Sequence, residues 1–133
     1  MAAEVRCLLP EYPVVEMVVD GLLTAEDGAQ AMGAGMALSA EHGVWNTLAD
    51  FTHLRRTASG SDIVALADAA ASTGLPPEWQ EAVVLPLEPN AAVWARLWEA
   101  AAVNRGLRVK CFHDRESALA WLVFGDDHSP VGS

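Results

Sequence analysis

Basic residues are scarce in this sequence. Eight lysines and arginines stand against 18 aspartates and glutamates, which gives a net charge of -10 over 133 residues. A surface of this sign repels phosphate backbones and anionic membranes, and the basic residues do not gather into a stripe that would reverse it locally. The composition therefore argues against a nucleic-acid partner.

Cysteine and long apolar runs are also in short supply. Cys7 and Cys111 stand far apart in apolar segments, without the CxxC or Cys/His spacing of a metal site, so we expect two buried free thiols. Residues 1–5 lack the basic and apolar regions of a signal peptide, and no apolar run reaches the roughly 18 residues of a membrane span. These absences predict a soluble, cytoplasmic protein with no membrane insertion.

Recognisable catalytic spacings are missing as well. No glycine-rich phosphate loop follows an expected strand, and the histidines show no HExxH or HxxxH spacing, so we predict no cofactor, no metal site and no catalytic residue. One enzymatic alternative stays open. His53 and His113 both follow expected strands, and together with Asp50 and Asp114 they could bind a metal or move a proton at one edge of a sheet.

The sequence does contain a regular alternation of strand-like and helical segments. Runs rich in β-branched residues predict strands at residues 5–9, 13–20, 44–51, 81–86 and 107–112. Helical spacing predicts helices at about residues 25–42, 62–72, 91–105 and 115–122. Gly21 is expected to close an N-terminal hairpin. The predicted fold class is α/β, with a mixed, mostly parallel sheet of about five strands, an N-terminal hairpin and four helices.

Capping residues mark the ends of these helices. Thr24 and Asp27 resemble a capping box at the start of the first helix, and Gly43 suits its end. Ser61 can cap the second helix and Asp114 the last. We expect a single domain over residues 1–125, followed by a polar C-terminal tail over residues 126–133.

Tryptophan is the most informative aromatic residue. Trp94 and Trp98 fall on one face of the third expected helix, together with Leu97 and Ala101, and such a stripe is typical of packing against a sheet. Three interpretations stay open for the set as a whole: core packing, a subunit interface in a homodimer, or the wall of a ligand pocket. The set consists of Trp79, Trp94, Trp98 and Trp121.

Three segments resemble the STAS domain and its relatives among the CRAL-TRIO lipid-binding domains, and more narrowly the SpoIIAA-like group of small bacterial proteins. The likeness covers residues 4–124 and depends on the order and spacing of these segments. They are the helix entry at residues 20–24, the strand at residues 46–51 that ends on an acid, and the closing strand and helix at residues 109–112 and 116–122.

The resemblance implies a non-enzymatic domain that works by binding a protein partner or an apolar small molecule. In the anti-sigma-factor antagonists of the STAS family, a serine or threonine in an Asp-Ser-Ser-Gly-like turn before the second helix is phosphorylated. The matching residues here are Ser59 and Ser61, although no aspartate precedes Ser59 and Asp62 follows Ser61. A phospho-regulated switch at Ser59 or Ser61 is therefore the regulatory alternative.

Overall fold

The computed structural model describes residues 3–57 and 59–125. The strands are β1 (Ala3–Cys7), β2 (Val15–Leu23), β3 (Asn46–Thr57), β4 (Gln80–Val84) and β5 (Val109–Phe112). The helices are α1 (Ala25–His42), α2 (Gly60–Ser72), α3 (Pro89–Asn104) and α4 (Arg115–Phe124). The expected order of two strands followed by alternating helices and strands is confirmed.

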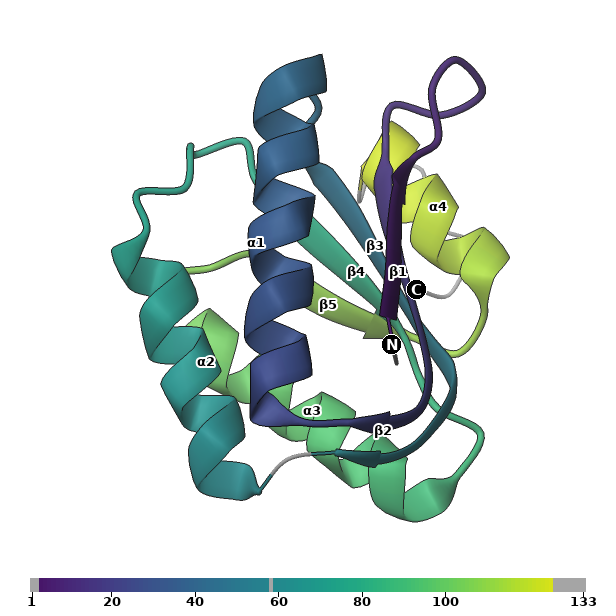
Figure 1. Ribbon diagram of the computed structural model, residues 1–133. Coiled ribbons are helices and arrows are strands. Elements are labelled where there is room, and N and C mark those ends of the chain that lie inside the picture. Colours follow the sequence, from purple (N-terminus) through teal and green to yellow (C-terminus); the bar gives the residue numbers. More distant parts are fainter. Residues whose placement is uncertain (1–2, 58, 126–133) are drawn as a thin grey trace.

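The strands form one five-stranded sheet in the order β1-β2-β3-β4-β5. β1 pairs with β2 antiparallel, and every other neighbouring pair is parallel. Each helix that connects two parallel strands crosses over in the same right-handed sense, so α1, α2 and α3 all cover one face, while α4 lies on the other (Figure 1). The mixed, mostly parallel α/β fold expected from the sequence is confirmed, and β3 is its central strand.

Two strands run further than the sequence indicates. Gly21 does not close the hairpin. It adopts a φ of 75° inside β2, at a register shift that lets the strand continue beside β3 to Leu23. β3 likewise continues to Thr57, so His53 lies in a strand and not in a loop. The ends of β2 and β3 pair with each other, and this pairing provides hydrogen-bond partners for backbone N–H and C=O groups in segments where the sequence pattern predicts a loop.

Three of the four predicted helix caps are confirmed, on α1 and α4, and the cap predicted for α2 is wrong. Thr24 accepts a hydrogen bond from the backbone N–H of Asp27, whose carboxylate in turn accepts from Thr24, and Gly43 ends α1 in a left-handed conformation. Asp114 caps α4 through the N–H of Ser117. The cap of α2, however, is Ser59, which accepts from the N–H of Asp62, because the helix begins at Gly60.

The sheet separates two apolar cores. The larger core lies between the sheet and α1, α2 and α3, and it includes Val83, Phe51 and Trp79. The smaller one lies beneath α4, where Leu48 and Trp121 are buried. None of the helices in the described part of the chain has the length and apolar character needed to cross a membrane. The polar tail expected at residues 126–133 lies outside the described residues.

Candidate functional site

A partly enclosed cavity of about 100 Å³ lies in the larger core, between the sheet and α1, α2 and α3. Strands β2, β3 and β4 form its floor, and the three helices form its walls. The aliphatic and aromatic residues of its lining include Met17, Met32, Met36, Phe51, Leu54, Ile63, Leu66, Trp79, Trp94 and Trp98. Such a lining is typical of a site that takes an apolar ligand.

Methionine is concentrated at this cavity. The protein has four methionines, and three of them, Met17, Met32 and Met36, line the cavity. The thioether side chain is unbranched and polarizable, so it adapts to ligands of different shape. Sequence reasoning missed this group, because Met17 lies on β2 and the other two lie on α1.

Small residues of α1 keep the cavity open. Gly28 and Gly35 line it beside Ala31. A Cβ atom added at Gly35 would meet nothing within 4 Å, whereas one at Gly28 would lie 3.1 Å from Leu66. The glycines of this helix thus have different roles, and Gly35 borders empty space.

Glu81 places a carboxyl group in this apolar wall. It lies on β4 and is only 5% exposed, and it is the one residue with an ionisable side chain among the described residues that line the cavity. The indole Nε1–H of Trp98 donates to its Oε1 at 2.5 Å. Burial raises the pKa of Glu81 from 4.5 to about 7, and the hydrogen bond from Trp98 opposes part of this rise.

Cys111 lies next to this part of the core. Its thiol is 3.8 Å from the carbonyl oxygen of Ala95, and its backbone N–H donates to Oε2 of Glu99 at 2.7 Å. Burial, followed by the negative charge of Glu99, raises the pKa of Cys111 to about 12. The thiol therefore stays neutral near pH 7 and is not an activated nucleophile.

The four tryptophans do not share one wall. Trp79, Trp94 and Trp98 line the cavity, whereas Trp121 lies on the opposite face of the sheet. There its ring centroid is 5.6 Å from that of Phe112. Trp94 and Trp98 are both half-buried, so they do not form the exposed patch that a subunit interface on this helix would need.

The turn before α2 touches the wall of the cavity. A Cβ atom on Gly60 would lie 3.2 Å from the Trp94 ring, so the first turn of α2 packs closely on α3. Ser59 and Ser61 flank Gly60, and both are exposed, with their hydroxyl oxygens 3.1 Å apart. Phosphorylation of either serine stays a prediction.

The histidines suggested as an enzymatic cluster lie on or just after strands that are not neighbours in the sheet, and the enzymatic alternative stays a prediction. His53 is exposed on β3, and His113 is exposed just after β5, with β4 between these two strands. Among residues 3–57 and 59–125, no group of three or more histidine, cysteine or acidic side chains could hold a metal ion. Asp50, one of the two acids proposed for this cluster, accepts hydrogen bonds from the backbone N–H and the hydroxyl of Thr52.

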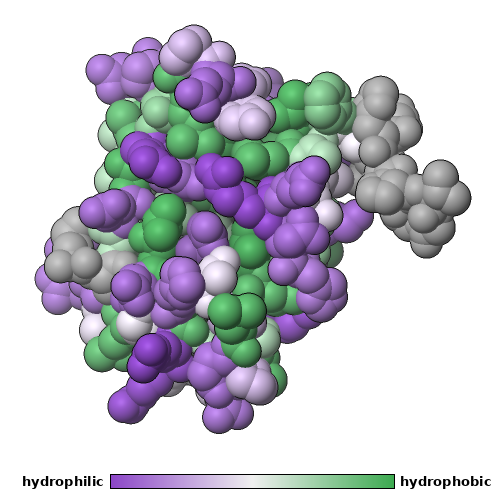
Figure 2. All heavy atoms as spheres, turned by 90° about the vertical axis from the view of Figure 1, so that its right-hand side faces the viewer, coloured by the Kyte–Doolittle hydropathy of each residue, from purple (hydrophilic) through white to green (hydrophobic). Residues whose placement is uncertain are grey.

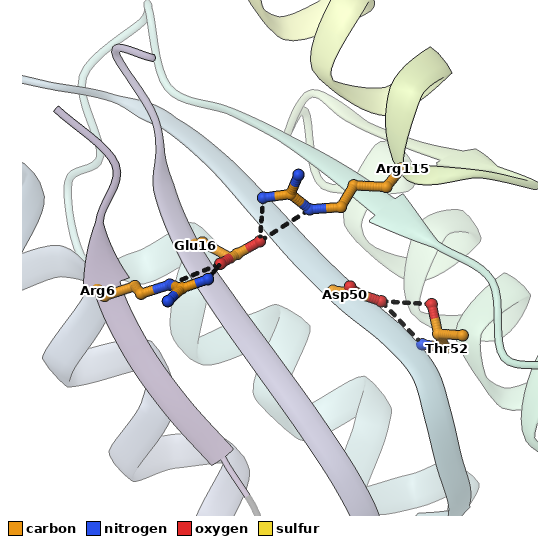
Figure 3. A network of polar contacts seen from close by, with 5 residues as sticks. All are labelled: Arg6, Glu16, Asp50, Thr52 and Arg115. Carbon is orange, nitrogen blue, oxygen red and sulfur yellow. Dashed lines mark hydrogen bonds and ion pairs between the residues drawn. The ribbon is translucent and has the colours of Figure 1, made fainter. Parts of the chain in front are cut away.

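A second buried acid lies on the α4 side of the sheet. Glu16 is 1% exposed, and its two carboxylate oxygens bind different cations (Figure 3). Arg6 of β1 contacts Oε1 at 2.8 Å, and Arg115 of α4 contacts Oε2 at 2.7 Å. This pairing ties β1, β2 and α4 together and leaves Glu16 without an oxygen open to a ligand, so we assign it a structural role.

The outer surface on that side has no single large apolar patch. Figure 2 shows hydrophobic residues interspersed with hydrophilic ones over the face that carries α4. Phe124 and Val123 at the end of α4 are exposed, as are Leu9 and Tyr12 in the hairpin loop. The best-formed candidate site is therefore the cavity beneath α1, α2 and α3.

Comparison with known proteins identifies the fold. The crystal structure of an uncharacterised protein of the DUF3478 family from Shewanella loihica PV-4, described as having a SpoIIAA-like fold, matches over 91% of this chain and 92% of its own, with a TM-score of 0.54 and 24% sequence identity. Neither the models of known protein families nor the curated protein sequences give a match. The chain thus has a SpoIIAA-like fold, as the sequence resemblance implied, whereas the likeness to CRAL-TRIO domains stays a prediction.

Proposed function

We propose that this domain is a binding protein that holds a small apolar molecule in the cavity between its sheet and α1, α2 and α3. The observation that carries the proposal is the lining of that cavity, in which three methionines and three tryptophans surround empty space. A packed core has few voids larger than a water molecule, so an apolar void of this size is an unusual feature. Binding an apolar molecule would recover the contacts that its walls lack.

The volume limits the occupant. An engineered apolar cavity of about 150 Å³ in another protein accepts benzene, so a cavity of about 100 Å³ that is partly open suits a single ring or a short alkyl chain. Methionine side chains can move to admit a somewhat larger group. The ligand class that fits is a small aromatic or aliphatic molecule, or the end of a longer one.

A protein partner is less well supported. The tryptophans that would form a docking patch on α3 face the cavity, and the exposed apolar residues of the described chain are dispersed over several elements. A stable interface requires a contiguous, complementary surface. We therefore favour the small molecule over the protein partner, and homodimer formation stays a prediction.

The test uses toluene as the probe. Toluene is titrated into isotope-labelled protein, and changes in the amide NMR spectrum and in tryptophan fluorescence report binding. We expect saturable changes at residues of α1, α3 and β4. Gly35→Leu should abolish them, because it directs a side chain from α1 into the open space that a Cβ at this position would meet.

Gly33→Leu is the matched control. Gly33 lies on the exposed side of the same helix, and both substitutions raise helix propensity by about 1 kcal/mol relative to glycine. The control should bind toluene like the parent protein. The proposal is overturned if toluene does not bind the parent protein, or if Gly35→Leu binds it unchanged.

A further inference from the structure

The carboxyl group of Glu81 lies in a cavity wall whose other side chains are almost all apolar. Its register partners are Thr47 on β3 and Val109 on β5, and the same strand carries Ala82 and Val83, both fully buried. A buried ionised carboxylate needs a cation or several hydrogen-bond donors to replace lost hydration. Glu81 receives one donor, from Trp98, on one of its two oxygens.

No side-chain cation offsets Glu81 within the described residues. On α3, Glu99 pairs with Arg96 at 3.5 Å, and on β5 the Cys111 thiol stays neutral near pH 7. The elements β2, β3, α1 and α2 present apolar, glycine or threonine side chains to the cavity. The contrast with Glu16, which has an arginine on each oxygen, is direct.

We propose that the cavity recognises a small apolar amine, whose ammonium group binds the carboxylate of Glu81 while its apolar body packs against the tryptophans and methionines. This rests on the proposed function above and names the chemical class of its ligand. The ammonium supplies the missing cation, and its three N–H donors suit an oxygen that has lone pairs to spare. An apolar carboxylic acid in its ionised form would be repelled by the same group.

Affinity for the amine should depend on pH in a defined direction. The ion pair requires Glu81 to be ionised, and its pKa of about 7 means that at pH 6 most of the free protein holds the proton. Affinity should therefore rise between pH 6 and pH 8, while the amine itself stays protonated throughout. The high pKa of Cys111 leaves its thiol neutral over this range.

The experiment compares three probes with one ring each: benzylamine, benzyl alcohol and toluene. Calorimetric titration at pH 8 should give benzylamine the tightest binding, by roughly ten- to a hundredfold over benzyl alcohol, the range expected for a hydrogen bond to a charged group. Glu81→Gln should remove this preference and leave toluene binding in place. Glu99→Gln, a nearby acid outside the cavity lining, should keep the preference.

The outcomes separate this inference from the proposed function. Two results would overturn the amine as ligand and leave the apolar site in place. One is that toluene binds but benzylamine binds no more tightly than benzyl alcohol, and the other is that Glu81→Gln still prefers benzylamine. If no probe binds the parent protein, both fall. Should Glu81→Gln fail to fold, the parent protein alone decides: benzylamine affinity must rise from pH 6 to pH 8 while toluene affinity stays level, and a level benzylamine affinity overturns the inference.

Discussion

Glu81, which lines the cavity, lowers the stability of the folded protein near neutral pH. Its carboxyl group is buried on β4, an interior strand of the sheet, and burial raises its pKa to about 7. The folded protein therefore holds a proton on Glu81 at pH values where the unfolded chain, with an ordinary pKa of 4.5, has lost it. It follows that Glu81 lowers the free energy of unfolding as the pH rises from about 4.5 to about 7, with no further change above that window.

Replacing Glu81 by glutamine should remove this pH dependence. Glutamine resembles the protonated carboxyl group and can still accept the Trp98 indole hydrogen bond. Relative to the parent protein, Glu81→Gln should gain stability on going from pH 5 to pH 8, by on the order of 3 kcal/mol for the full shift. Urea unfolding at the two pH values measures the difference, and Glu99→Gln is the control. An equal difference between parent and variant at both pH values would contradict the assignment.

Among the elements, the start of α2 differs between the sequence-based prediction and the structure in a way that can be tested. The helix begins two residues earlier than the pattern indicates, so the capping role belongs to Ser59 and not to Ser61. Ser61 instead sits in the first turn, exposed, with its hydroxyl near that of Ser59. Two serines with the same chemistry therefore contribute differently to the helix.

Alanine substitution should distinguish the two serines. Ser59→Ala removes the acceptor for the Asp62 N–H and should lower the free energy of unfolding by about 1 kcal/mol. Ser61→Ala should change it little, and Ser59→Asp should restore stability, because a carboxylate caps the helix and complements its dipole. Urea unfolding of the three variants tests this, and equal losses for both alanine variants would show that Ser59 is not the cap.

The predicted elements were largely right in type and order, but their ends were less well defined. Thr24, Gly43 and Asp114 were correctly identified as caps because each acts on backbone groups within a few residues. The prediction that Gly21 closes the hairpin was wrong. Gly21 has a left-handed φ at a register shift inside β2, and that shift depends on pairing with β3, which is distant in sequence. Local sequence signals thus predict the helix caps, which depend on hydrogen bonds between residues close in sequence.

At the scale of the whole molecule, the excess of acidic residues is the dominant electrostatic feature. A net charge of -10 on 133 residues repels itself in the compact state and lowers stability at low ionic strength. The same field raises the local concentration of small cations, which agrees with an amine as the ligand. It also works against any occupant that carries negative charge.

Screening this field should stabilise the protein. We expect Tm to rise as sodium chloride is increased from about 10 mM to about 300 mM, because the Debye length falls from about 30 Å to below 10 Å. A Glu4→Gln, Glu78→Gln variant, which removes two exposed charges, should have a higher Tm at low salt and a smaller rise. Scanning calorimetry provides the measurement, and a level or falling Tm in the parent protein would contradict the expectation.

The sequence by itself determined the α/β class, the order of the elements and most helix caps, because these depend on periodicity and on short-range hydrogen bonds. It also indicated that tryptophans could form a pocket, but not which ones. The tertiary structure decided that Trp79, Trp94 and Trp98 share a cavity while Trp121 lies across the sheet, and it placed Glu81 among apolar side chains. Those relations arise when strands and helices distant in sequence pack face to face, and no local pattern encodes them.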